Sequence, residues 1–290
     1  MDTATSARTG KGAGDENFPV ASWLIAPRHR PAIFAFYDFV RTADDVADHA
    51  TLAPAEKLRL LDQLEAGLTG HDDREAVAVR LRTVLSQRGL APQHAIDLLD
   101  AFRRDVHKLR YESWDELIDY CSLSAMPVGR YVLDVHGESQ ALWPANDALC
   151  AALQIINHLQ DCGKDYRALD RVYVPREAMA EAGVDVGALG ADRASPALRR
   201  CLSGLARRTG TLLDEAAAFS GAIRDRRLSL EVAVIHRLAV RLVRLLERRD
   251  PLSEKVHIGK AGALGVVLGV LAGRWRRRRK PETLELRLPT

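Results

Sequence analysis

The chain has no segment in which apolar and polar residues alternate over a useful length, and no repeat of fixed period. A half-buried β-strand needs that alternation and a solenoid needs that repeat, so neither kind of fold is expected. Aromatic residues make up only 6% of the 290 residues, whereas Ala, Leu and Arg are abundant. Because these residues favour helix, the composition predicts an all-α protein with a sizeable core.

Cysteine and glycine motifs are also scarce. The four cysteines form no CxxC pair and no zinc-ligand spacing, and we interpret them as core thiols of a reducing cytoplasm. No GxGxxG follows a strand pattern, so the sequence lacks the usual fingerprint of a dinucleotide site. The cysteines are Cys121, Cys150, Cys162 and Cys201.

No linker divides the chain, and no apolar run reaches the roughly 20 residues that span a bilayer. The N-terminus lacks the apolar core of a signal peptide, so residues 1–15 are expected to form a disordered tail. We expect one all-α domain over 16–273, followed by a basic tail over 274–290. Helices are predicted at about 31–49, 54–68, 74–88, 92–110, 114–134 with a kink or close approach at Pro127–Gly129, from Trp143 through Asp165, at 196–220 and at 227–249.

Two short carboxylate runs on helical stretches are the most informative residues present. Asp44 and Asp48 are four residues apart, and so are Asp161 and Asp165. Residues at this spacing share a helix face, where like charges repel. A shared Mg²⁺ explains the arrangement, because Mg²⁺ is held by one or two carboxylates together with substrate phosphates. The alternative for either run alone is a solvated acidic face.

Apolar flanks favour the metal site over the solvated face. Phe34–Val40 precedes the first run and Leu153–Ile156 the second, so both carboxylate pairs should face a cavity. Arg41 lies one turn before Asp44, where it is suited to neutralise the carboxylates or to bind a phosphate. His158 neighbours the second run but is expected to point off the aspartate face, as a packing histidine.

Charge is unevenly distributed. Net charge is +3, but residues 271–290 hold seven basic and two acidic residues, which leaves −2 for the rest. The basic run Arg274–Lys280 follows the 13 apolar-rich residues 261–273. The apolar stretch and the basic run together indicate either an anchor on an anionic membrane surface or a last core helix with a solvated basic tail. No nucleic-acid partner is expected, since no aromatic-studded basic groove or known motif occurs elsewhere.

At these residues the sequence resembles the squalene/phytoene synthase family, from Glu16 to Lys260. Four segments carry the resemblance, in the family's order and spacing. They are Tyr37-x-x-x-Arg41-x-x-Asp44-Asp45-x-x-Asp48, then Asp105 with Arg110-Tyr111 and Tyr120–Gly129, then Gln154-x-x-Asn157-x-x-x-Asp161-x-x-x-Asp165, and Arg171–Pro175. At three places the sequence differs from the usual phytoene synthase residues and resembles the bacterial subgroup that makes hydroxysqualene for hopanoids. These places are Ser124–Gly129, Gln160 and His236.

The resemblance implies a single-domain isoprenoid-synthase helical bundle around a central cavity. It implies Mg²⁺ as cofactor, a prenyl diphosphate as substrate, and Tyr120 beside the four aspartates as catalytic residue. The implied metal ligands are Asp44, Asp48, Asn157, Asp161 and Asp165. The implied substrate-binding residues are Phe18, Tyr37, Arg41, Gln154, Asn157 and Lys255; for each aromatic residue, core packing is the alternative.

The activity expected first is conversion of presqualene diphosphate to hydroxysqualene, with water capturing the final carbocation. A second hypothesis is head-to-head condensation of two farnesyl diphosphates to presqualene diphosphate, squalene or dehydrosqualene. A third is a non-catalytic assembly or scaffold member, which we expect to have lost aspartates that this chain retains. The expected location is the cytoplasm, peripheral on the inner face of the membrane, with a sister presqualene diphosphate synthase acting upstream.

Overall fold

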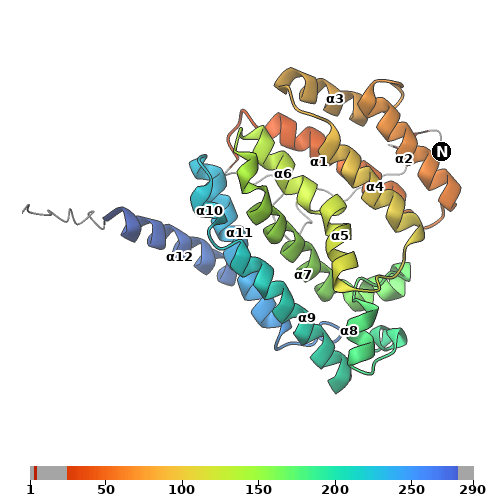
Figure 1. The fold of residues 1–290 in the computed structure, drawn as a ribbon, viewed down its shortest axis with the longest axis vertical. Helices are drawn as coiled ribbons and strands as arrows, with labels where there is room; N and C mark the ends of the chain where they lie inside the picture. Colours follow the sequence, from red (N-terminus) through yellow and green to blue (C-terminus); the bar gives the residue numbers. More distant parts are fainter. Residues whose placement is uncertain (1–2, 5–24, 280–290) are drawn as a thin grey trace, which may run out of the picture.

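The computed structural model describes residues 3–4 and 25–279, with side chains as far as Gly273. Within these ranges the chain forms helices joined by loops, and the only β-type pairing is an isolated bridge between Arg110 and Val172. The all-α prediction is confirmed (Figure 1). The helices are α1 Arg30–Ala47, α2 Pro54–Thr69, α3 Ala76–Arg88, α4 Gln93–His107, α5 Trp114–Ser124, α6 Met126–Val135, η2 Gln140–Leu142, α7 Trp143–Leu169, α8 Arg176–Glu181, η3 Val186–Gly190, α9 Pro196–Glu215, α10 Phe219–Ala222, α11 Arg226–Leu246 and α12 Lys260–Arg279.

Proline fixes the start of several helices. Pro31, Pro54, Pro144 and Pro196 lie in the first turn of α1, α2, α7 and α9, where the missing N–H leaves no hydrogen bond unmade. Pro127 has the same role in α6. The prediction of one kinked helix over 114–134 is therefore wrong, because the chain ends α5 before Ala125 and begins α6 after it.

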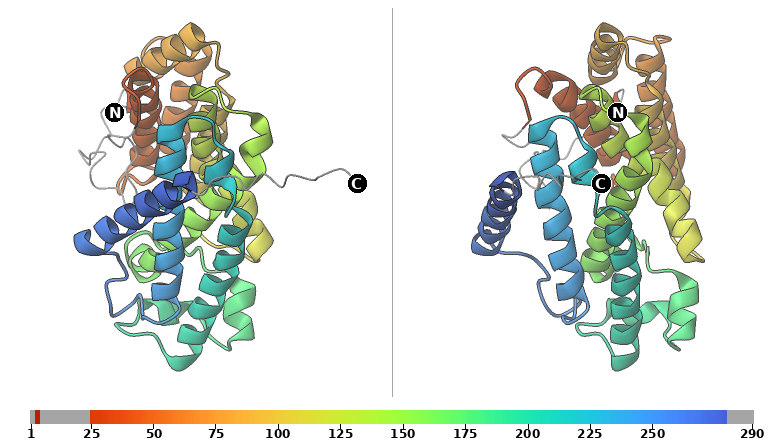
Figure 2. Two further views of the ribbon diagram at one scale, coloured as in Figure 1. Left: turned by 90° about the vertical axis from the view of Figure 1, so that its left-hand side faces the viewer. Right: turned by 60° about the vertical axis from the view of Figure 1, so that its left-hand side comes forward.

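The helices enclose two apolar clusters. One joins α1–α4 to residues of α6, and the other joins α5 and α7 to α9 and α11. Figures 1 and 2 show how these helices are arranged. The longest helix, α7, packs against α5, α6, α9 and α11. A Cβ on Gly129 of α6 would lie 2.1 Å from Asn146 Oδ1 of α7, so the predicted close approach at this glycine is confirmed.

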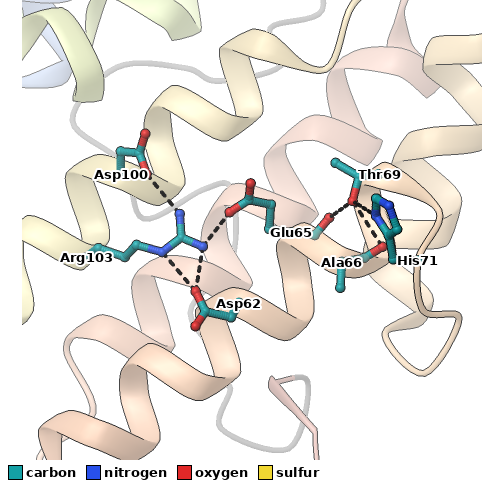
Figure 3. A network of polar contacts seen from close by, with 7 residues as sticks. All are labelled: Asp62, Glu65, Ala66, Thr69, His71, Asp100 and Arg103. Carbon is teal, nitrogen blue, oxygen red and sulfur yellow. Dashed lines mark hydrogen bonds and ion pairs between the residues drawn. The ribbon is translucent and has the colours of Figure 1, made fainter.

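A polar network ties α2 to α4 on the side away from α7. The Arg103 guanidinium donates to Asp62 Oδ1 over 2.8 Å and to Asp100 Oδ1 over 2.9 Å, and it also binds Glu65 (Figure 3). Its side chain is about one-fifth exposed. The network fixes the register of two helices that pack against α1.

Helix α12 differs from the others because it projects from the bundle (Figures 1 and 2). It packs against α11, yet its three leucines are about half exposed. It is therefore not a core helix in the described structure. Among residues 25–279, no helix has the combination of length and apolarity needed to cross a bilayer.

Candidate active site

The two motifs meet at a carboxylate-lined cavity of about 340 Å³, which we call the polar cavity. Helix α1 carries the first motif and ends just before Asp48, while α7 carries the second. Asp44 and Asp48 line the cavity from one side, and Asp165 lines it from the other. Four further residues singled out from the sequence line the same cavity, namely Tyr37, Arg41, Tyr120 and Gln154.

The remaining sequence-predicted residues lie elsewhere. Asp161 and Lys255 line a separate polar cavity of about 570 Å³, together with Lys164 and Arg167. Asn157 lies on α7 one turn before Asp161 and lines neither cavity. Phe18 falls outside the described residues. The loop after α11 is held against α7 by the Gln160 side-chain amide, which donates to the carbonyl of Val256.

Arg41 organises the first motif. Its guanidinium donates to Asp44 Oδ2 over 2.7 Å and to Asp45 Oδ1 over 2.8 Å. The Asp45 side chain is only 2% exposed, so it anchors Arg41 from within the bundle while Asp44 faces the cavity. This placement agrees with an orienting role for Asp45 rather than direct metal ligation.

The carboxylates crowd each other enough to shift their ionisation. Burial, then the neighbouring Asp48, raises the pKa of Asp44 to about 7, although Arg41 opposes the shift. Burial and Asp161 raise the pKa of Asp165 to about 6. Carboxyl groups with raised pKa values hold their charge at neutral pH more readily when a cation joins them. The site therefore favours a bound cation.

The donor set fits Mg²⁺. It consists of hard carboxylate oxygens on two facing helices, beside arginine side chains suited to phosphate. Among the described residues, no three of these carboxylates converge within 4.8 Å. Mg²⁺ commonly keeps several waters and takes further ligands from substrate phosphates, so one or two carboxylates suffice.

A different cluster does converge, at His29, His136 and Asp225. Arg28 Nε donates to His29 Nε2 over 2.9 Å, and the Arg28 guanidinium lies 3.7 Å from Asp225 Oδ2. Arg88 lies 3.5 Å from the other nitrogen of His29. Two guanidinium groups therefore already lie beside the cluster, and their positive charge disfavours a metal ion there. We interpret the cluster as a polar junction between α1, α6 and α11.

Sequence reasoning assigned no role to Asp105 and Arg171, which form a buried network under the cavity. Tyr120 donates its hydroxyl proton to Asp105 Oδ2 over 2.6 Å, and Tyr173 donates to Asp105 Oδ1 over 3.5 Å. Arg171 Nη1 donates to Asp48 Oδ1 over 2.9 Å. Burial raises the pKa of Asp105 to about 6, although Arg171 and Tyr120 oppose the shift. Neither residue belongs to a local pattern of charged residues, so the family resemblance is the only signal in the sequence that includes them.

The prediction for His158 is wrong. It was placed off the aspartate face, but it lines the polar cavity with Asp165. It lies four residues after Gln154, which lines the same cavity, and this spacing keeps both on one helix face. Its ring stacks on Tyr173 with centroids 3.5 Å apart. Burial, then Arg171, lowers the pKa of His158 to about 3, so its imidazole is neutral.

A second, largely apolar cavity of about 370 Å³ adjoins the polar one. Tyr37, Val40 and Val128 line both cavities, so they mark the junction. The apolar cavity extends between α1, α6, α7 and α11. Phe36 lines it and stacks on Tyr131 with centroids 3.9 Å apart, so this aromatic residue both packs and faces the cavity.

Comparisons with known proteins agree with this architecture. The squalene/phytoene synthase family matches residues 12–261. The chain is 59% identical to a hydroxysqualene synthase of Rhodopseudomonas palustris, over 89% of this chain and 88% of that one. It is 53% identical to a hydroxysqualene synthase of Sinorhizobium fredii, over 96% and 95% of the two chains.

Solved structures show the same fold. The crystal structure of a squalene synthase from Alicyclobacillus acidocaldarius superposes with a TM-score of 0.72 and 29% identity, covering 84% of this chain and 92% of that one. A dehydrosqualene synthase superposes with a TM-score of 0.75 at 22% identity, over 87% and 89% of the two chains. The prediction of a prenyl-diphosphate-processing enzyme with an isoprenoid-synthase helical fold is confirmed, and the chain belongs to the squalene/phytoene synthase family.

Proposed function

We propose that this enzyme converts presqualene diphosphate to hydroxysqualene with release of diphosphate, as a Mg²⁺-dependent step of squalene and hopanoid biosynthesis. The observation that carries the proposal is the junction of a carboxylate-lined cavity with an apolar one. A molecule with a diphosphate head and long hydrocarbon tails is complementary to these two adjoining cavities. Hydroxysqualene synthases that share 53–59% identity with this chain support the same substrate class.

Each residue then has a distinct task. Asp44, Asp48 and Asp165 would hold Mg²⁺ from the two sides of the polar cavity, with Asn157 and Asp161 on the same motif of α7. When bound, Mg²⁺ neutralises diphosphate and makes it a better leaving group.

Arg41 and Lys255 are proposed to bind phosphate oxygens, and Asp45 keeps Arg41 in place. Gln154 is oriented by Ser124, whose hydroxyl donates to Gln154 Oε1 over 2.8 Å at the cavity wall.

Loss of diphosphate leaves a carbocation that must be shielded. Tyr37 and Tyr120 line the polar cavity and offer aromatic faces, which stabilise positive charge without reacting with it. The Tyr120 hydroxyl is held by Asp105, which fixes the ring. The apolar cavity beyond Tyr37 excludes bulk water from the hydrocarbon chain.

The reaction requires water and no nicotinamide. Purified enzyme should therefore be incubated with Mg²⁺ and either presqualene diphosphate or farnesyl diphosphate, without NADPH, and the products identified. We expect hydroxysqualene from presqualene diphosphate and little product from farnesyl diphosphate. Efficient formation of a thirty-carbon hydrocarbon from farnesyl diphosphate would instead support the condensing activity, and no turnover of either substrate would support a scaffold role.

We propose that the enzyme works in the cytoplasm, on the inner face of the membrane. Its substrate and product are long isoprenoids that partition into lipid. A sister enzyme that makes presqualene diphosphate is the proposed upstream partner.

A further inference from the structure

The outward face of α12 is a row of leucines. Leu264, Leu268 and Leu271 are 58%, 57% and 45% exposed. Their spacing of four and three residues puts them on one side of the helix. Among the residues whose side chains are described, the only other large hydrophobic side chain with comparable exposure is Phe34, at 44%. Three adjacent leucines in water need a partner surface.

The opposite face of α12 is occupied by α11. A Cβ on Gly262 would lie 3.6 Å from the Arg241 guanidinium, and one on Gly269 would lie 3.6 Å from Arg237 Nη1. Leu264 follows Gly262 by two residues, which rotates it roughly 200° around the helix. The small residues thus let α12 lie against arginine side chains of α11, and the leucines face away from the protein.

The partner's chemistry follows from the next segment. Helix α12 continues to Arg279, and residues 274–279 contain five arginines and one tryptophan. Exposed leucines followed by a basic run match the interface of an anionic bilayer, where apolar contact and charge attraction act together. We propose that α12 docks the enzyme on an anionic lipid surface through this leucine row and basic run. This inference rests on the proposed membrane location and is independent of the reaction catalysed.

The test is flotation of the full-length protein with vesicles of phosphatidylcholine alone or with phosphatidylglycerol. We expect binding only to the anionic vesicles, weakening as salt rises. A triple Leu264→Ser, Leu268→Ser, Leu271→Ser variant should bind at least about tenfold more weakly, and so should replacement of the five arginines by glutamine. Phe34→Ser is the matched control and should bind as wild type does.

Unchanged vesicle binding by the leucine variant would overturn the proposal. Sedimentation of the same proteins without lipid tests whether a second copy of the chain, instead of lipid, covers the leucine row. Self-association that is lost in the leucine variant, with vesicle binding retained, would assign the row to a second copy of the chain.

Discussion

Asp44→Asn should stabilise the metal-free protein while it abolishes turnover. Asp44 has a pKa of about 7 in the folded protein against 3.8 for an ordinary aspartate, because burial and Asp48 oppose its charge. The folded state therefore binds more protons than the unfolded state between about pH 4 and 7. Stability from this group is present below the ordinary pKa and is lost as pH rises through about 7.

The magnitude follows from the shift. About three pKa units at roughly 1.4 kcal/mol each give an upper limit of about 4 kcal/mol. The Asp44 side chain is 34% exposed, so solvent screening reduces this to about 2 kcal/mol. At pH 8, Asp44→Asn removes a charge that is unfavourable in the absence of a cation, and we expect a gain of about that size. The opposing ion pair with Arg41 is already contained in this shift.

The assay is urea unfolding in chelator at pH 5 and pH 8, repeated with Mg²⁺. The variant should gain more stability over wild type at pH 8 than at pH 5, where only part of the penalty on the Asp44 charge is present, and Mg²⁺ should stabilise wild type more than the variant. Asp119→Asn is the control, since Asp119 is 63% exposed and pairs with Arg104; a change within about 0.5 kcal/mol is expected. A loss of stability in metal-free Asp44→Asn at pH 8 would refute the reasoning.

Three further predictions concern the scaffold and the metal. Gly129→Ala should lower the free energy of unfolding by about 3 kcal/mol, because its Cβ would lie 2.1 Å from Asn146 Oδ1; an unchanged urea midpoint would contradict this. Arg171→Ala should lower the free energy of unfolding by about 3 kcal/mol and lower kcat, because Asp105 stays buried without the Arg171 charge and Asp48 loses its ion pair. Stability and kcat equal to wild type would count against the network. Excess chelator should abolish turnover by the wild-type enzyme and added Mg²⁺ should restore it; full activity in chelator would exclude the metal site.

Much of the helical framework follows from local sequence. The predicted helix at 31–49 is observed at Arg30–Ala47, and that at 54–68 is observed at Pro54–Thr69, because proline at the first turn and apolar periodicity are both local signals. The break at Ala125 was missed, since Pro127 is compatible with either a kink within one helix or the start of another. Only packing against α7 distinguishes the two.

The site was less accessible to sequence reasoning. The i, i+4 aspartates signal shared helix faces, and the structure places Asp44, Asp48 and Asp165 on one cavity. The pairing of Arg171 with Asp48 joins residues 123 positions apart, so no local pattern reveals it. The prediction for His158 was wrong, because its four-residue spacing from Gln154 puts both side chains on the helix face that lines the cavity.

The central claim is that water captures a carbocation generated from presqualene diphosphate. The most direct test is a single turnover of presqualene diphosphate by the wild-type enzyme with Mg²⁺ in ¹⁸O-labelled water, without NADPH, followed by mass spectrometry of the product. We predict one ¹⁸O atom in the hydroxyl group of hydroxysqualene. Hydroxysqualene without the label, or a hydrocarbon as the sole product, would contradict the account.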